Sequence, residues 1–81
     1  MDTQTELLEK LDLLHTTELG AVRIKRNLSL DTDDTVGWCR AKIEADSAVI
    51  ERRGKNYYIT VDGCIITVNA HSYTIITAHK Y

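Results

Sequence analysis

The chain has no proline and no run of apolar residues long enough to cross a bilayer. Its first residues, MDTQTE, also lack the basic stretch followed by an apolar stretch that a secretory signal peptide carries. These absences predict a cytoplasmic protein without membrane contact. With 81 residues, of which 43% are hydrophobic and 27% are charged, the sequence is typical of a single compact domain over residues 1–81.

Residues that commonly hold metals or cofactors are scarce. The two cysteines, Cys39 and Cys64, are far apart in the sequence and lie in apolar segments, which favours buried reduced thiols over a disulfide. Neither they nor the three histidines have the spacing of a zinc site. The DTDDTVG segment has Val36 where a calcium loop needs glycine. Because a glycine-rich phosphate loop, a nucleophile elbow and a dinucleotide fingerprint are also missing, we expect no metal and no cofactor.

Charge of one sign does not dominate, but it is unevenly distributed along the chain. Residues 1–47 hold ten Asp and Glu against six Lys and Arg, whereas residues 48–81 hold two against four. The second part is therefore mildly basic. This is far weaker than the basic surface of a dedicated DNA-binding domain, which disfavours tight non-specific nucleic-acid binding and leaves contact with RNA open.

The sequence begins with a pattern that is typical of an amphipathic helix over residues 3–14. Thr3 stands three residues before Glu6, which is the spacing of a capping box. Leucines recur on one stripe of the helix, at Leu7, Leu8, Leu11 and Leu14.

Two further helices are predicted, over residues 17–28 and 32–45. Thr17 is a suitable N-cap for the first of them, and either Asp31 or Thr32 for the second. Their expected buried stripes are Gly20, Ile24 and Leu28, followed by Val36, Cys39 and Ile43.

After these helices the apolar period changes from helical to two. Four short runs rich in β-branched and aromatic residues predict strands over residues 48–53, 56–61, 64–69 and 73–79. The Asp62-Gly63 pair favours a two-residue type I′ hairpin, because both positions tolerate a positive φ. We therefore predict an α+β fold in which two or three N-terminal helices pack on one face of a four-stranded antiparallel meander.

The turns also predict which side chains share a face of the sheet. A two-residue loop at Asp62-Gly63 gives one apolar face, formed by Tyr57, Ile59, Val61, Cys64, Ile66 and Val68. The opposite, open face then carries Glu51, Arg53, Tyr58, Thr60, Ile65, Thr67 and Asn69. A three-residue loop at residues 70–72 would add Tyr73, Ile75, Thr77 and His79 to the open face, and a slip of one residue would send them inward.

The open face brings together the residue types that metal-free RNA cleavage needs. Such cleavage requires a base, an acid, and donors or positive charge near the phosphate. His79 could exchange the proton, with Thr77 and Lys80 beside it, and Tyr58, Thr67, Asn69 and Arg53 could position RNA. A solvated sheet face with cross-strand pairs explains the same residues without any activity.

The segments LLHTTELGAVRIKRNL, DTDDTVGWCRAKI, RRGKNYYITV and ITVNAHSYTIITAHK together resemble a small bacterial family of uncharacterised domains, over nearly the whole chain. The order of helices followed by a meander that ends in a threonine- and histidine-bearing strand also resembles the barnase, EndoU, colicin and RelE-like nuclease fold. That resemblance implies a terminal-strand pair at His79 and Thr77, a helix-borne cation at Arg23 or Arg26, and a further site residue at His15 near the helix junction.

Two functions of different class are therefore open. The first is a metal-independent ribonuclease-like or RNA-interacting domain. The alternative is a non-catalytic module that binds a protein partner, as in toxin–antitoxin or phage-defence systems. Whether the protein is an enzyme is left open by the sequence, and an exposed outer strand would permit a homodimer.

Overall fold

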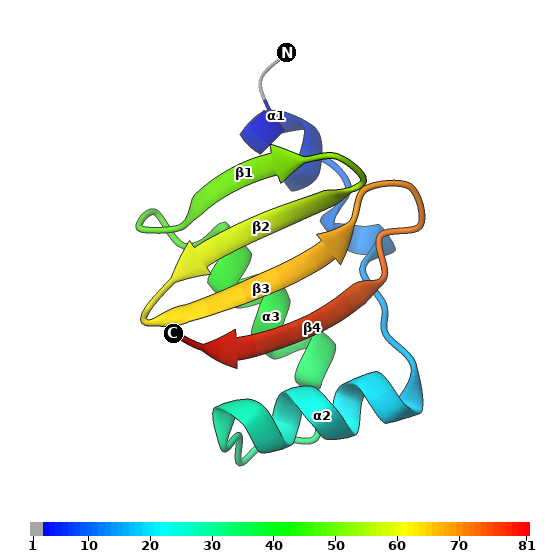
Figure 1. Cartoon of the computed structure of the whole chain (residues 1–81), viewed down its shortest axis with the longest axis vertical. Coiled ribbons are helices and arrows are strands. Elements are labelled where there is room, and N and C mark those ends of the chain that lie inside the picture. Colours follow the sequence, from blue (N-terminus) through cyan, green and yellow to red (C-terminus); the bar gives the residue numbers. More distant parts are fainter. Residues whose placement is uncertain (1–2) are drawn as a thin grey trace.

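The computed structural model describes residues 3–81, with side chains from Thr5 onward. Helices come first in the chain and a four-stranded antiparallel sheet follows (Figure 1). The predicted α+β fold class is confirmed. The helices are α1 (Thr3–Leu8), the short 3-10 helix η1 (Leu11–Leu13), α2 (Glu18–Leu28) and α3 (Thr35–Glu44). The strands are β1 (Val49–Arg53), β2 (Asn56–Val61), β3 (Cys64–Asn69) and β4 (Ile75–Lys80), and they lie side by side in chain order.

The first predicted helix is divided in two. α1 ends at Leu8, and η1 begins three residues later. The break has a tertiary cause, because the chain turns here to bring His15 beside the start of β4, where its backbone bonds to Tyr73 and Ile75. The predicted stripe is retained except at Leu8, which is 37% exposed. The predicted cap at Thr3 lies outside the described side chains.

α2 and α3 begin at side-chain caps. Thr17 accepts a hydrogen bond from the Gly20 amide at 2.9 Å, as predicted. α3 is capped by Asp34, which accepts from the Gly37 amide at 3.0 Å, and not by Asp31 or Thr32. The Thr32 hydroxyl instead accepts from the Asp34 amide in the preceding turn, which places the cap two residues later than the sequence suggested. Among the described helices, none has the length and apolar character that a membrane crossing needs.

The β2–β3 hairpin has the predicted register. Val61 pairs with Cys64, and Ile59 with Ile66. The connecting residues, Asp62 and Gly63, have φ angles of 48° and 77°, as a type I′ turn requires.

The last hairpin has an irregular register. Thr67 pairs with Thr77, whereas the next residue of β3, Val68, pairs with Ile75. Ile76 is therefore an extra residue on β4, and the irregularity is a β-bulge. Without the bulge, Ile75 and Thr77 would share a face of the sheet. With it, Ile75 points to the core and Thr77 points to the open face.

This bulge corrects part of the predicted face assignment. Thr77 and His79 lie on the open face, since their partners on β3 do. Tyr73 and Ile75 are buried in the core, although the three-residue loop would have put them on the open face too. Tyr73 also has a φ of 57°, a left-handed conformation that the sequence pattern did not suggest.

The core lies between the sheet and the helices. α1 and α3 cover the back of the sheet, and α2 runs beside β4 (Figure 1). The largest fully buried side chains come from α1, α2 and α3 and from β2, β3 and β4: Leu7, Ile24, Cys39, Ile43, Tyr57, Ile59, Ile66, Val68 and Ile75. The other face of the sheet is left without a helix over it.

The outer side of β4 is occupied by polar groups from the helical part of the chain. The His15 carbonyl accepts from the Ile75 amide at 2.7 Å, and the Thr16 hydroxyl donates to the Ile75 carbonyl at 2.9 Å. Further along the strand, the Asn27 side chain of α2 donates to the Ala78 carbonyl at 3.2 Å. These bonds fix α2 alongside β4.

Candidate functional site

The open face of the sheet carries most of the predicted site residues. One row of paired positions crosses three strands, from Tyr58 on β2 through Thr67 on β3 to Thr77 on β4. His79 pairs with Ile65 in the neighbouring row. The structure thus brings Tyr58, Thr67, Thr77 and His79 onto adjacent positions of one face, on which Thr67 is only 7% exposed.

Tyr58 is held by charged neighbours from β1. The Arg53 guanidinium lies over the Tyr58 ring, 5.3 Å from its centroid, and donates to the Glu51 carboxylate at 2.9 Å. The Arg53 side chain is 72% exposed. An exposed pair of this kind contributes little to stability, so the Arg53 cation is free to turn toward a ligand.

Sequence reasoning missed Asn56, which lies next to Tyr58 on the same face. Its side-chain nitrogen is 3.5 Å from the Tyr58 hydroxyl, and its buried oxygen has no hydrogen-bond partner within residues 3–81. The predicted hairpin register pairs Asn56 with Asn69. Because Asn69 was predicted on the open face, its partner Asn56 could have been placed there too, next to Tyr58.

Asn69 has a clear structural role. Its side-chain oxygen accepts hydrogen bonds from the His71 and Ser72 amides, each at 2.9 Å, and so closes the loop between β3 and β4. This is an Asx-type turn. The predicted role of Asn69 in positioning RNA stays a prediction.

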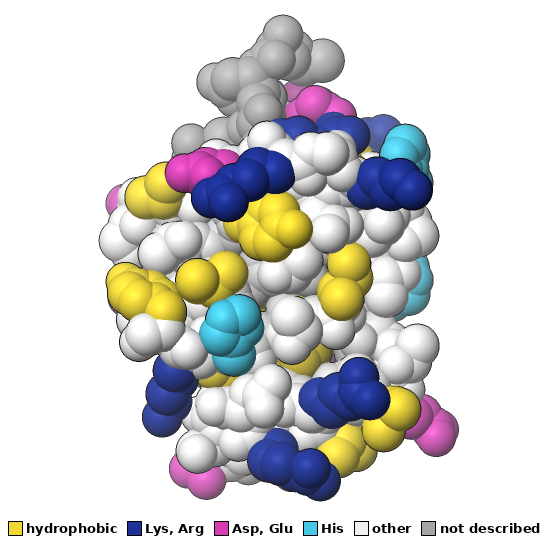
Figure 2. All heavy atoms as spheres, in the orientation of Figure 1, with side chains coloured by type: hydrophobic (Ala, Val, Ile, Leu, Met, Phe, Trp, Pro, Cys, Tyr) yellow, Lys and Arg dark blue, Asp and Glu magenta, His cyan; other side chains and the backbone are white. Residues whose placement is uncertain are grey.

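The predicted cations lie along the margin of the open face. Lys80 ends β4 after His79, and both side chains are exposed, but Lys80 pairs with Cys64 of the buried face and so starts from the helical side of the sheet. Arg23 and Arg26 are exposed on α2, which runs beside β4. Figure 2 shows basic side chains over α2 and along the rim of the sheet, with the acidic ones mostly at the outline of this face. Cations therefore lie on both sides of the open face, at the rim of the sheet and on α2.

His15 lies at the opposite end of β4 from His79. Its Nδ1 is 3.0 Å from the Leu13 carbonyl and therefore carries the proton of that hydrogen bond, while its Nε2 is 3.0 Å from the Thr74 hydroxyl. At a rise of about 3.3 Å per residue, Thr74 and His79 are about 16 Å apart along the strand. The two histidines cannot touch the same phosphate group in this arrangement.

The residues around His15 form a hydrogen-bonded chain that sequence reasoning did not find. The Thr74 hydroxyl is 2.7 Å from the Ser72 hydroxyl, which in turn donates to the Asn69 oxygen at 3.3 Å. These hydrogen bonds fasten the start of β4 to the segment before α2. Its partners are nearly sixty residues apart in sequence, so no local pattern indicates it.

Within residues 3–81, no three His, Cys, Asp or Glu side chains cluster as they would to hold a metal ion. Both cysteines are free thiols. The arrangement of the open face supports contact with an anionic, partly aromatic ligand through a tyrosine, hydroxyls, an imidazole and peripheral cations.

Comparison with known proteins relates the chain to a family model. No curated protein and no solved structure matches the chain, so the resemblance to the nuclease fold stays a prediction. A family model described as a protein of unknown function, DUF3781, matches residues 8–79. This match includes α2, α3 and the whole sheet except its last residue, Lys80. The chain therefore belongs to the DUF3781 family of proteins of unknown function.

Proposed function

We propose that this domain binds single-stranded RNA across the open face of its sheet. The observation that carries the proposal is the position of Tyr58, in the middle of a face that no helix covers and whose margins carry exposed cations. Proteins that bind single strands combine an aromatic platform, on which a base stacks, with a basic path for the backbone. Tyr58 supplies the platform, and Arg53 supplies part of the path.

The remaining residues of the face fit the same ligand. Arg53 can leave the Tyr58 ring for a phosphate, because its side chain is largely exposed. The Thr77 hydroxyl and the His79 imidazole both lie on β4, two strands from Tyr58, within the span of neighbouring nucleotides. α2 extends the basic margin with Arg23 and Arg26.

The first test is binding of a fluorescein-labelled, single-stranded 12-nucleotide RNA, followed by fluorescence anisotropy. Replacing Tyr58 by leucine should weaken binding about 5- to 150-fold, because a stacked base contributes roughly 1 to 3 kcal/mol. Arg53→Gln should also weaken binding and lower the salt dependence by about 0.7 in the slope of log K against log salt.

Lys10→Gln is the matched control, since Lys10 is an exposed lysine between α1 and η1 on the helical side. It should change RNA affinity less than twofold. Equal losses in Arg53→Gln and Lys10→Gln would mean that RNA senses net charge only, and wild-type affinity in Tyr58→Leu would overturn the proposed face.

Cleavage of the bound RNA is a separate prediction. An imidazole is the commonest general acid–base group, and His79 is exposed on the binding face. Incubation of the protein with single-stranded RNA in excess chelator should give fragments, and His79→Ala should abolish them while leaving Tm nearly unchanged. Cleavage that persists in His79→Ala would contradict the role of His79. Binding without any cleavage would leave an RNA-binding module that is not an enzyme.

A further inference from the structure

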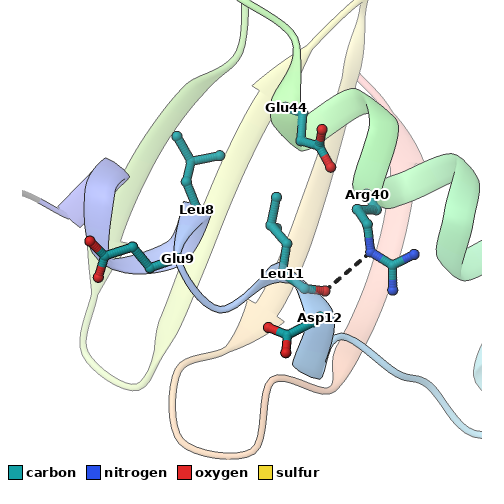
Figure 3. A pocket seen from close by; sticks show the side chains of 6 residues that line it. All are labelled: Leu8, Glu9, Leu11, Asp12, Arg40 and Glu44. Carbon is teal, nitrogen blue, oxygen red and sulfur yellow. Dashed lines mark hydrogen bonds between the residues drawn. The ribbon is translucent and has the colours of Figure 1, made fainter.

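On the helical side of the molecule, α1, η1 and α3 border a shallow hollow that is wide open to solvent. Its lining consists of Leu8, Glu9, Leu11, Asp12, Arg40 and Glu44 (Figure 3). The two leucines form the apolar part of the hollow. The carboxylates around them belong to Glu9, which follows α1, to Asp12 on η1 and to Glu44 on α3. None of these residues belongs to the open face of the sheet.

Leu8 is the feature that internal packing does not explain. The sequence pattern puts it on the buried stripe of the first helix, but α1 ends there and its side chain stays 37% exposed at the hollow. The neighbouring Leu11 is almost fully buried and gives the hollow an apolar floor. An apolar side chain of a partner could cover both leucines and remove this surface from water.

The charges around this floor are unbalanced. Glu9, Asp12 and Glu44 form no ion pair within 4.0 Å in the described part of the chain. Arg40, the cation of the hollow, donates through Nε to the Leu11 carbonyl at 3.2 Å and so ties α3 to η1 (Figure 3). The residues that line the hollow therefore carry three carboxylates and one guanidinium, and this lining is negative.

This chemistry selects the kind of ligand. A negative lining repels the phosphates of RNA, and so wide an opening would bury too little of a small molecule. A protein segment supplies both an apolar anchor and flanking cations, as do basic amphipathic segments that dock into grooves. We propose that the hollow formed by α1, η1 and α3 docks a basic segment of a protein partner, with one apolar side chain on Leu8 and Leu11 and its Lys or Arg side chains on Glu9, Asp12 and Glu44.

The proposal is independent of RNA binding, and the two can fail separately. The probe is the synthetic peptide KLLKKLLK, titrated into isotope-labelled protein while backbone amide signals are followed by NMR. We expect the largest shifts in residues 8–12 and 40–44. The peptide KSSKKSSK, which has the same charge and no anchor, should bind at least tenfold more weakly.

Matched variants separate docking from general attraction. Glu44→Lys should weaken binding of KLLKKLLK at least tenfold. Asp31→Lys makes the same change of charge before the opposite end of α3, at an exposed residue, and should weaken it less than threefold. Both variants should retain the wild-type amide spectrum away from the substitution, which shows that each is folded.

Three results would overturn the proposal. Equal weakening in Glu44→Lys and Asp31→Lys would reduce the effect to net charge. Shifts of residues 8–12 on addition of single-stranded RNA would assign the hollow to a different macromolecule. Shifts there that grow with protein concentration alone would make a second copy of this chain the occupant.

Discussion

Raising the pH from 8 to 11 should lower the free energy of unfolding by about 4 kcal/mol through two buried acids. Burial raises the pKa of the Cys39 thiol from 9.0 to about 12, and the nearby Cys64 adds to the shift. Burial also raises the pKa of the Tyr57 hydroxyl from 10.0 to about 12, with smaller contributions from Tyr73 and Glu6. Both groups keep their protons in the folded protein.

The sign of the effect follows from which state loses protons first. Above about pH 9 the unfolded chain releases the Cys39 proton, and above about pH 10 the Tyr57 proton, while the folded protein holds both until about pH 12. Stability is therefore lost as the pH rises through this window. At pH 11 Cys39 accounts for about 3 kcal/mol of the loss and Tyr57 for about 1.

Urea denaturation at pH 8 and at pH 11 measures this loss, and two variants assign it. Tyr57→Phe removes a buried hydroxyl that makes no hydrogen bond within the described residues, so it should be nearly neutral at pH 8 and should reduce the loss by about 1 kcal/mol. Cys39→Ala should be destabilising at pH 8 but should reduce the loss by about 3 kcal/mol. If both variants lose as much free energy of unfolding between pH 8 and pH 11 as the wild type, Cys39 and Tyr57 are not the source of the loss.

The second large effect is expected from a pair of isoleucines. Ile66→Ala should lower the free energy of unfolding by roughly 2 to 5 kcal/mol, because it opens a cavity in a packed core. Ile76→Ala should cost less than about 0.5 kcal/mol, as surface substitutions do. Ile66 is fully buried on β3, whereas Ile76 is the bulged residue of β4 and is 45% exposed.

Chemical denaturation of the two variants at pH 8 gives both values, provided that the dependence of stability on denaturant is unchanged. If Ile66→Ala does not fold, Ile66→Val provides the comparison, with an expected cost of about 0.5 to 1.5 kcal/mol. Similar costs for Ile66→Ala and Ile76→Ala would contradict the bulge and the register that follows from it.

Where the determinants were local, the sequence predicted the structure well. β2 and β3 have their predicted bounds and pairing, since the Asp62-Gly63 turn fixes the register of the strands beside it. Thr17 caps α2 as expected, because a cap is a contact over three residues. The same locality put Tyr58 and Thr67 on one face.

The differences arise where distant segments meet. The bulge at Ile76 and the left-handed Tyr73 accompany the bonds that join His15 and Thr16 to the start of β4. The first helix breaks for the same reason. These contacts join residues nearly sixty positions apart, so neither the exposure of Leu8 nor the hydrogen bonds of His15 could be predicted from periodicity.

The polar groups of His15, Thr16 and Asn27 along β4 also limit how the molecule can polymerise. A folded domain with two free sheet edges can add copies without end and grow into a fibre. Here the amide and carbonyl of Ile75 and the carbonyl of Ala78 are already bonded within the molecule, which leaves β1 as the remaining edge of the described sheet. Strand-to-strand growth that uses this edge ends at two copies, because the pair has β4 at both of its outer ends.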